Sequence, residues 1–115
     1  TSLTYNASTV SFVETVLFSR LAGQYLTDEE RRKLQQAFVD DPELGDVIPG
    51  SGGVRRVRWG MAGRGKRGGL RAIYFLRLQK GQIWMLTLYP KNVADSIPEH
   101  VLREIRDEID AQEGN

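Results

Sequence analysis

The hydrophobic and polar positions along the chain predict a short strand followed by a pair of helices. Val10–Val13 alternates apolar with polar residues at first, as a strand does. Apolar residues then recur at helical spacing at Leu17, Phe18, Leu21 and Tyr25. A capping-box pattern at Thr27 and Glu30 predicts the start of a second helix, which should bury Leu34, Ala37 and Phe38. That helix ends before Pro42, because a proline disfavours helical geometry in the preceding residue. The two helices should form a hairpin with almost no loop.

The middle of the chain predicts two strands that flank a glycine-rich loop. Residues 42–53 contain two prolines and four glycines, so we expect no regular element there. Val54–Trp59 alternates in the manner of a strand, and Leu70–Leu78 is rich in aromatic and branched residues. The loop between them, Gly60–Gly69, contains five glycines and three cations.

The last part of the chain predicts a covered strand and an amphipathic helix. Gln82–Tyr89 is nearly all apolar, which indicates an inner strand, and Lys80–Gly81 makes the turn before it. Ser96 can cap a final helix, with Glu99 completing a capping box and Pro98 in the first turn. The apolar stripe of that helix is Val101, Leu102, Ile105 and Ile109. The order β-α-α-β-β-β-α predicts an α+β fold.

Charge is unevenly distributed, although the net charge is only +1. Ser51–Lys80 carries nine Lys and Arg residues and no Asp or Glu. Residues 1–50 carry four basic and eight acidic residues, and residues 99–115 carry two basic and six acidic. A concentrated positive patch is the usual footprint of a polyanion site, most often for nucleic acid. The alternative is a solvated surface that pairs with the acidic flanks.

The predicted strands place several of these cations together. Arg56 and Arg58 share one face of a strand, and Arg71 begins the neighbouring strand near them. Three more cations lie in the connecting loop: Arg64, Lys66 and Arg67. Guanidinium groups suit a phosphate because they offer planar, bidentate donors. The same-face arrangement favours a phosphate site over scattered surface arginines.

Composition excludes several classes of function. A chain of 115 residues forms one domain, for which we expect residues 1–9 to be an N-terminal extension and residues 112–115 a frayed tail. No apolar run approaches the roughly 20 residues of a membrane helix. The absence of cysteine excludes disulfides and thiolate chemistry, and one histidine excludes a multi-His metal site. We expect that histidine, His100, to be an ordinary surface residue.

Two catalytic motifs are also disfavoured. Gly63–Gly68 is rich in glycine but lacks the Gly-Lys-Ser/Thr ending of a P-loop, and no helix is predicted after it. The basic stretch contains no pair of carboxylates, so glycosidase or metal–carboxylate chemistry is not indicated.

Three segments together resemble the HigB-like branch of the RelE/ParE toxin superfamily, the toxins of bacterial type II toxin–antitoxin modules. They are Leu44–Arg58, Gly65–Tyr74 and Leu88–Asn92, in this order and spacing. The resemblance extends over roughly Val10–Ile109. It implies a RelE-like fold with a helical hairpin and a C-terminal helix packed on a small, mostly antiparallel four-stranded sheet.

The resemblance also implies an activity. Such a protein would be a ribosome-dependent, metal-independent endoribonuclease that cleaves mRNA in the A site, by attack of a 2′-hydroxyl on the adjacent phosphate, and thereby inhibits translation. By motif position, the catalytic residues would be Arg58, Lys66, Arg67, Arg71, Tyr89 and Lys91. The RNA-binding residues would be Arg55, Arg56, Arg64 and Arg77. No metal or cofactor is implied. Some relatives use a histidine or a glutamate as base, and neither stands at a matching position here.

Partners follow from the same resemblance. It implies a cognate antitoxin, of the helix-turn-helix HigA-like kind, together with the ribosome and mRNA. Operator DNA would be reached only through the antitoxin, no membrane is implied, and the protein would be cytoplasmic. Two alternatives remain open: a ParE-like toxin that inhibits gyrase, and a non-catalytic module that binds RNA or the ribosome. The dense basic cluster argues against the gyrase alternative.

Overall fold

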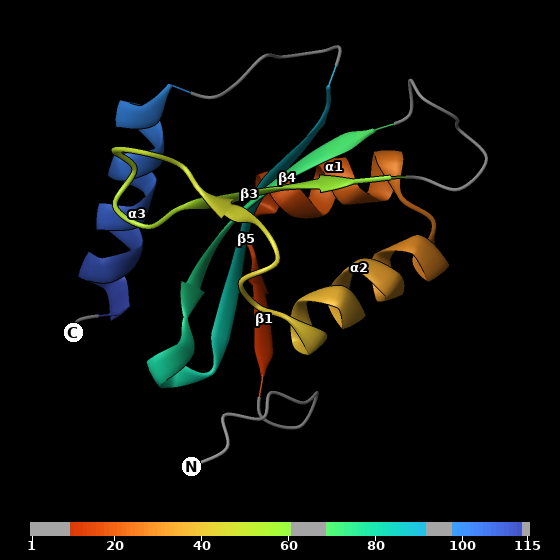
Figure 1. Ribbon diagram of the computed structural model, residues 1–115, viewed down its shortest axis with the longest axis horizontal. Coiled ribbons are helices and arrows are strands. Elements are labelled where there is room, and N and C mark those ends of the chain that lie inside the picture. The colour runs from red at the N-terminus through yellow and green to blue at the C-terminus, as the bar shows by residue number, and fades with distance from the viewer. Residues whose placement is uncertain (1–9, 61–68, 92–97, 114–115) are drawn as a thin grey trace.

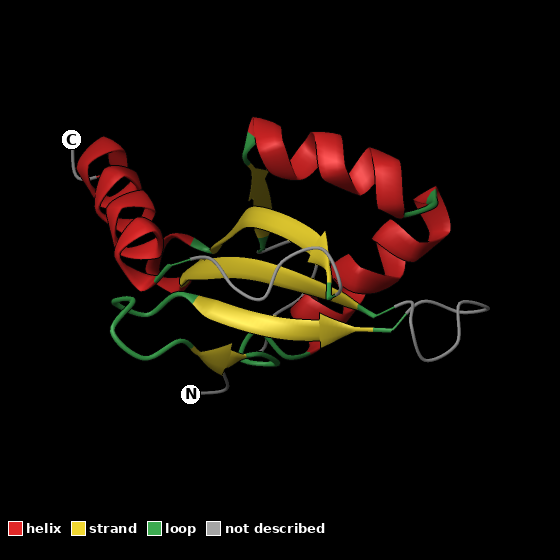
Figure 2. Cartoon of the chain, turned by 90° about the horizontal axis from the view of Figure 1, so that it is seen from above, coloured by secondary structure: helices red, strands yellow, loops and turns green. Residues whose placement is uncertain are grey.

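A five-stranded mixed sheet forms the centre of the molecule (Figures 1 and 2). The structure is a computed structural model that describes residues 10–60, 69–91 and 98–113. Its strands are β1 (Ser11–Glu14), β2 (Asp46–Val47), β3 (Arg55–Trp59), β4 (Leu70–Arg77) and β5 (Gln82–Pro90). They lie in the order β1-β5-β4-β3-β2, with β1 parallel to β5 and all other neighbours antiparallel. The predicted inner position of the apolar strand, now β5, is confirmed.

The helical hairpin forms as the capping residues predict. Helix α1 (Val16–Tyr25) and helix α2 (Asp28–Asp40) are separated by two residues, Leu26 and Thr27. The Thr27 hydroxyl accepts a hydrogen bond from the Glu30 amide at 3.1 Å, and the Glu30 carboxylate accepts one from the Thr27 amide at 2.8 Å. This capping box satisfies two amides that the first turn of a helix leaves without partners.

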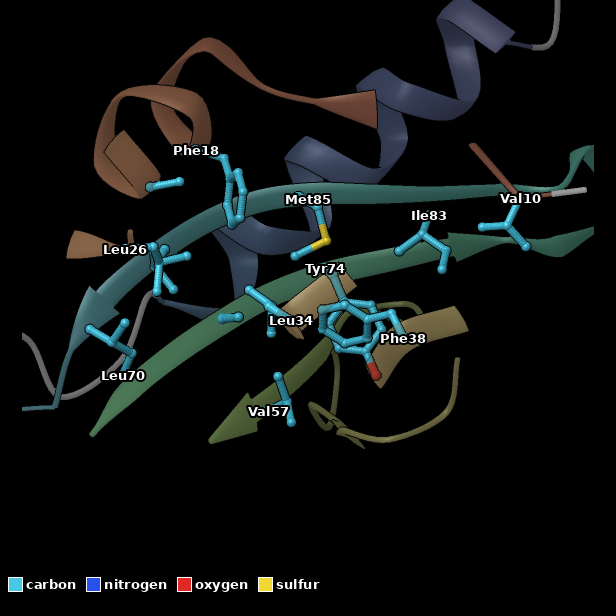
Figure 3. Packing of buried hydrophobic residues seen from close by; sticks show 13 residues of the cluster. Val10, Phe18, Leu26, Leu34, Phe38, Val57, Leu70, Tyr74, Ile83 and Met85 are labelled. Carbon is cyan, nitrogen blue, oxygen red and sulfur yellow. The ribbon is translucent and has the colours of Figure 1, made fainter. Parts of the chain in front are cut away.

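The hairpin covers one face of the sheet with a single hydrophobic cluster (Figure 3). Phe18 and Ala22 of α1, and Leu34 and Phe38 of α2, are buried against it. The strands contribute Val57, Leu70, Ala72, Tyr74, Ile83, Met85 and Leu88. The rings of Phe38 and Tyr74 lie 4.4 Å apart between centroids, in a tilted arrangement.

The third helix, α3 (Glu99–Glu113), covers the opposite face of the sheet. Its Leu102 and Ile109 are buried in a second cluster. The sheet side of that cluster consists of Val54, just before β3, together with Ile73 and Phe75 of β4 and Leu86 and Tyr89 of β5. Figure 1 shows α3 and the hairpin on opposite sides of the strands. The predicted cap at Ser96 lies outside the described residues.

A β-bulge in β5 changes which face its last residues occupy. Ile73 of β4 pairs with Thr87, whereas the next residue, Tyr74, pairs with Met85, so Leu86 is the extra residue. After this bulge, the residues of β5 alternate between the two faces of the sheet with a shift of one position. Leu88 therefore faces the hairpin and Tyr89 faces α3. The carbonyl of Leu86 accepts a hydrogen bond of 2.7 Å from the hydroxyl of Thr15, the N-cap of α1.

Some details of the predicted fold are wrong. The segment 42–53 was predicted to lack regular structure, but Asp46–Val47 forms β2 and pairs with Arg56 and Arg55 of β3. The sheet therefore has five strands instead of the expected four. Long-range contacts hold this short strand, because the Gly45 amide donates to the Tyr74 hydroxyl at 2.8 Å and that hydroxyl donates to the Pro42 carbonyl at 3.0 Å. No local periodicity can encode such a pairing. The turn before β5 is also longer than predicted, since residues Leu78–Lys80 form a 3₁₀ turn ahead of Gly81.

Candidate functional site

The strand register brings the predicted basic residues to one face of the sheet. Arg58 of β3 lies directly opposite Arg71 of β4, and Arg71 lies opposite Tyr89 of β5. Residues that face each other across antiparallel strands project to the same side. Arg56, two positions before Arg58, shares that side. The expected proximity of these arginines is confirmed, and Tyr89 ends the same row.

A cavity of about 530 Å³ opens where the chain enters β2 beside β3. It is lined by Leu44, Gly45, Asp46, Arg56, Val57, Arg58 and Arg71. The side chains of Arg56 and Arg58 are exposed and that of Arg71 is half-buried. Three positive charges thus meet in a space large enough for a nucleotide-sized anion.

These three arginines differ from most others in the described part of the chain, because their guanidinium groups have no protein partner. Arg31, Arg55, Arg77 and Arg106 form ion pairs with carboxylates. Arg103 donates to the carbonyl of Gly50. Within residues 10–60, 69–91 and 98–113, no hydrogen bond or ion pair engages the side chains of Arg56, Arg58 or Arg71. Their charge is therefore available to a ligand.

Two predicted RNA-binding residues do not line the cavity. Arg55 projects to the hairpin side of β3, where it donates to the Gly45 carbonyl at 2.6 Å and lies 3.7 Å from the Glu43 carboxylate. Arg77 lies at the other end of β4, opposite Gln82, and forms an ion pair with Asp110 of α3. Both arginines connect elements of the fold, and an RNA-binding role for them stays a prediction.

The remaining predicted residues lie near the end of β5 or outside the described residues. Tyr89 is only 7% exposed, and among the described residues its hydroxyl has no hydrogen-bond partner. Lys91 follows β5, is exposed, and donates its amide to the Gly69 carbonyl at 3.1 Å. Arg64, Lys66 and Arg67 lie outside the residues that the structure describes.

Asp46 is the residue at this site that sequence reasoning missed. It pairs with Arg56 across β2 and β3, so it projects to the same face as the three arginines. Leu44, two residues before it, is 40% exposed and adds an apolar side chain to the cavity wall. In the sequence, Asp46 lies within the segment Leu44–Arg58, but its separation of ten residues from Arg56 does not by itself indicate proximity.

Tyr74 holds the cavity wall in place from the core. It is fully buried, and its hydroxyl bridges Pro42 and Gly45. Burial raises the pKa of Tyr74 above its ordinary value, and the hydrogen bond from Gly45 opposes that rise. A side chain at Gly45 would place its Cβ 2.6 Å from the carbonyl oxygen of Arg56, so only glycine fits beside β3.

The described residues contain no group of three or more His, Cys, Asp or Glu side chains placed to hold a metal ion. Nor is any helix among them long and apolar enough to cross a membrane.

Comparison with known proteins identifies the fold. No protein-family model matches the sequence. A mutant of the Escherichia coli toxin RelE in its free state superimposes with a TM-score of 0.57 at 11% identity, over 84% of this chain and 96% of that one. The RelE–RelB complex from the archaeon Pyrococcus horikoshii OT3 gives a TM-score of 0.47 at 23% identity, over 75% of this chain and 99% of that one. The superposition on Escherichia coli RelE shows that the chain has the α+β fold of the RelE toxins, and its described residues form three helices and a mixed sheet.

Proposed function

We propose that this protein is the toxin of a bacterial type II toxin–antitoxin system and acts as a ribosome-dependent endoribonuclease on mRNA. One observation carries the proposal: Arg56, Arg58 and Arg71, whose side chains have no partner among the described residues, line one cavity on a RelE-like sheet. The HigB-like motifs of the sequence support the same assignment.

The proposed reaction is attack of a 2′-hydroxyl on the adjacent phosphate in the ribosomal A site. Negative charge then builds on the phosphoryl oxygens, and preorganised guanidinium groups stabilise that charge. We assign Arg71 and Arg58 to the scissile phosphate, because they face each other at the centre of the row. Arg56 holds the RNA backbone beside them. The reaction in this form uses no metal or cofactor.

Residues at the end of the row contribute around this centre. Tyr89 is a group for proton transfer or base stacking, since its buried hydroxyl has no partner among the described residues. Lys91 adds a positive charge at the same end of β5. Arg64, Lys66 and Arg67 keep the roles that motif position implies, which are RNA binding for Arg64 and catalysis for the other two. We further propose a HigA-like helix-turn-helix antitoxin as the partner that neutralises the toxin.

The first test adds the purified protein to a cell-free bacterial translation reaction and maps the 5′ ends of the message. We expect new ends at defined codon positions, which disappear when ribosomes are omitted. Arg71→Ala should abolish these ends while the protein remains folded, because the half-buried guanidinium of Arg71 makes no hydrogen bond or ion pair with the described residues. Arg20→Ala removes one exposed positive charge from α1, away from the cavity, and should cleave like the wild type.

Other results of this experiment would redirect the assignment. An intact message with normal translation would remove the nuclease proposal and make a gyrase supercoiling assay the next measurement. An intact message with stalled translation would mean that the basic face binds the ribosome without cutting. Cleavage by Arg71→Ala at the wild-type rate would show that the site is assigned to the wrong residues.

A further inference from the structure

Among the described residues of the cavity wall, one carboxylate, that of Asp46, lies with three guanidinium groups. We propose that Asp46 is the general base of RNA cleavage, the group that takes the proton from the attacking 2′-hydroxyl. The inference rests on the proposed endoribonuclease function and gives a role to a residue to which the family resemblance assigned none.

The chemistry of the lining residues leaves Asp46 as the proton acceptor. Seven of the described residues line the cavity, and among these seven only Asp46 and the three arginines have ionisable side chains. Arginine remains protonated in proteins and offers only donors, so it cannot accept a proton. An ionised aspartate offers only acceptors. Among these lining residues, the arginines can therefore stabilise charge, and Asp46 is the group that can accept the 2′-hydroxyl proton.

Asp46 is also available for this role. In the described part of the chain, no ion pair or side-chain hydrogen bond engages its carboxylate. Other carboxylates of the fold are engaged: Glu14, Glu43 and Asp110 each pair with an arginine. If Asp46 served only to neutralise Arg56, its partner across the strands, an ion pair between them would be expected. The side chain is exposed instead.

The distances that a sheet imposes suit one phosphodiester group. Asp46 and Arg56 lie on neighbouring strands, about 5 Å apart, and Arg58 is two residues further along, about 7 Å. Arg71 lies on the next strand, opposite Arg58. A phosphate over Arg58 and Arg71 would thus have its neighbouring ribose within reach of Asp46.

Hydrogen bonds fix the backbone of Gly45, the residue before Asp46, at both its amide and its carbonyl. The Gly45 amide donates to the Tyr74 hydroxyl at 2.8 Å, and the Gly45 carbonyl accepts from Arg55 at 2.6 Å. The pairing of Asp46 with Arg56 fixes the residue itself. A base that is held in advance needs little reorganisation to meet its proton, which is the condition for efficient proton transfer.

The step balances as follows. An oxygen of the Asp46 carboxylate takes the 2′-hydroxyl proton as the bond from O2′ to phosphorus forms. The bond from phosphorus to O5′ breaks, and the leaving oxygen takes a proton from water. The products are a 2′,3′-cyclic phosphate and a 5′-hydroxyl end, and the protonated Asp46 returns its proton to solvent.

The test compares Asp46→Asn with wild type in single-turnover cleavage on programmed ribosomes. We expect cleavage to slow by about 100-fold or more, the usual contribution of a general base. Binding to ribosomes programmed with an mRNA that is 2′-deoxy at the attacking ribose should stay equal or become tighter, because a negative charge leaves the arginine cluster. Asp46→Glu, which keeps a carboxylate, should retain more cleavage than Asp46→Asn. Asp40→Asn, an exposed carboxylate on α2, should cleave like the wild type.

A modified substrate separates a base from an acid. An mRNA with sulfur in place of the bridging O5′ has a leaving group that needs no protonation. If Asp46 is the base, the defect of Asp46→Asn persists on this substrate. If the defect disappears, Asp46 protonates the leaving group instead and the inference is overturned.

The remaining outcomes distinguish the inference from the function on which it rests. If Asp46→Asn cleaves at the wild-type rate and Arg71→Ala does not, the role of Asp46 is overturned and the nuclease assignment stands. No cleavage by the wild type overturns both. Asp46→Ser provides a second neutral variant, and the thermal midpoint of each sample is measured as a control for folding. If Asp46→Asn and Asp46→Ser each lose cleavage and ribosome binding to the same extent, Asp46 has a structural role and the inference is overturned.

Discussion

At the scale of single residues, Tyr74 joins the hydrophobic core to the cavity. Its ring packs against Phe38, while its hydroxyl bridges Pro42 and Gly45 next to the cavity wall. Tyr74→Phe keeps the ring and removes the hydroxyl, so the buried Gly45 amide loses its acceptor. We expect a loss of roughly 1–3 kcal/mol in the free energy of unfolding, the cost of leaving a buried donor unsatisfied. Chemical denaturation at pH 8 measures it.

The same variant isolates a pH effect. Because burial raises the pKa of Tyr74, the unfolded chain loses this proton first, near the ordinary value of about 10. Above that pH the unfolded state binds fewer protons than the native state, so the stability of the wild type falls as pH rises. The advantage of wild type over Tyr74→Phe should therefore be full below pH 10 and shrink above it. An advantage that stayed constant to pH 11 would contradict this assignment.

At the scale of elements, β2 depends on the close approach of Gly45 to β3. A Cβ at Gly45 would meet the backbone of Arg56 at 2.6 Å, whereas a Cβ at Gly23 on the exposed side of α1 would meet nothing within 4 Å. Gly45→Ala should therefore destabilise the protein by roughly 1–3 kcal/mol, as overpacking does. Gly23→Ala should stabilise it by up to about 1 kcal/mol, because alanine favours a helix over glycine.

Thermal or urea unfolding of the two alanine variants gives the comparison directly. If the stability changes of the two glycine-to-alanine variants have opposite signs, the steric demand at β2 is separated from the general effect of glycine on chain entropy. Gly45→Ala with unchanged stability would mean that the contact between residues 45 and 56 can relax, and β2 would then be a weak support for Asp46.

At the scale of the whole molecule, the arginines divide into those that hold the fold and those that face solvent. For single-stranded nucleic acid, the logarithm of the binding constant falls linearly with the logarithm of the salt concentration, with a slope of about −0.7 per phosphate contact. Replacing Arg56, Arg58 or Arg71 with glutamine should therefore weaken binding to an RNA oligonucleotide and reduce the slope by about 0.7 each. Binding titrations at several salt concentrations measure both quantities.

Arg77→Gln is the matched comparison for these variants. The guanidinium of Arg77 is paired with Asp110, at the far end of β4 from the cavity. We expect the salt slope to stay unchanged and the stability to fall, since α3 loses an ion pair with the sheet. A reduced slope would instead extend the RNA-binding surface along β4, as motif position implies.

Much of the architecture could be predicted because its signals are local. The capping box at Thr27 needs only residues three apart. The alternation that sets Arg56 and Arg58 on one face needs only the period of a strand. The apolar run of β5 indicates burial on both faces without knowledge of its neighbours. The resemblance to the RelE/ParE superfamily added the packing of helices on the sheet, and the comparison with RelE confirms that fold.

Only the tertiary structure decided the composition of the cavity. The pairing of Asp46 with Arg56 involves a two-residue strand, which is too short for any period and is held by the distant Tyr74. The bulge at Leu86 shifts the alternation of β5, so that Tyr89 faces Arg71 and not the hairpin. Sequence by itself determined the elements and the cations that they carry, because those follow from neighbours along the chain. Strand register and the bulge depend on contacts between distant segments, and these decided which carboxylate and which hydroxyl join the arginines.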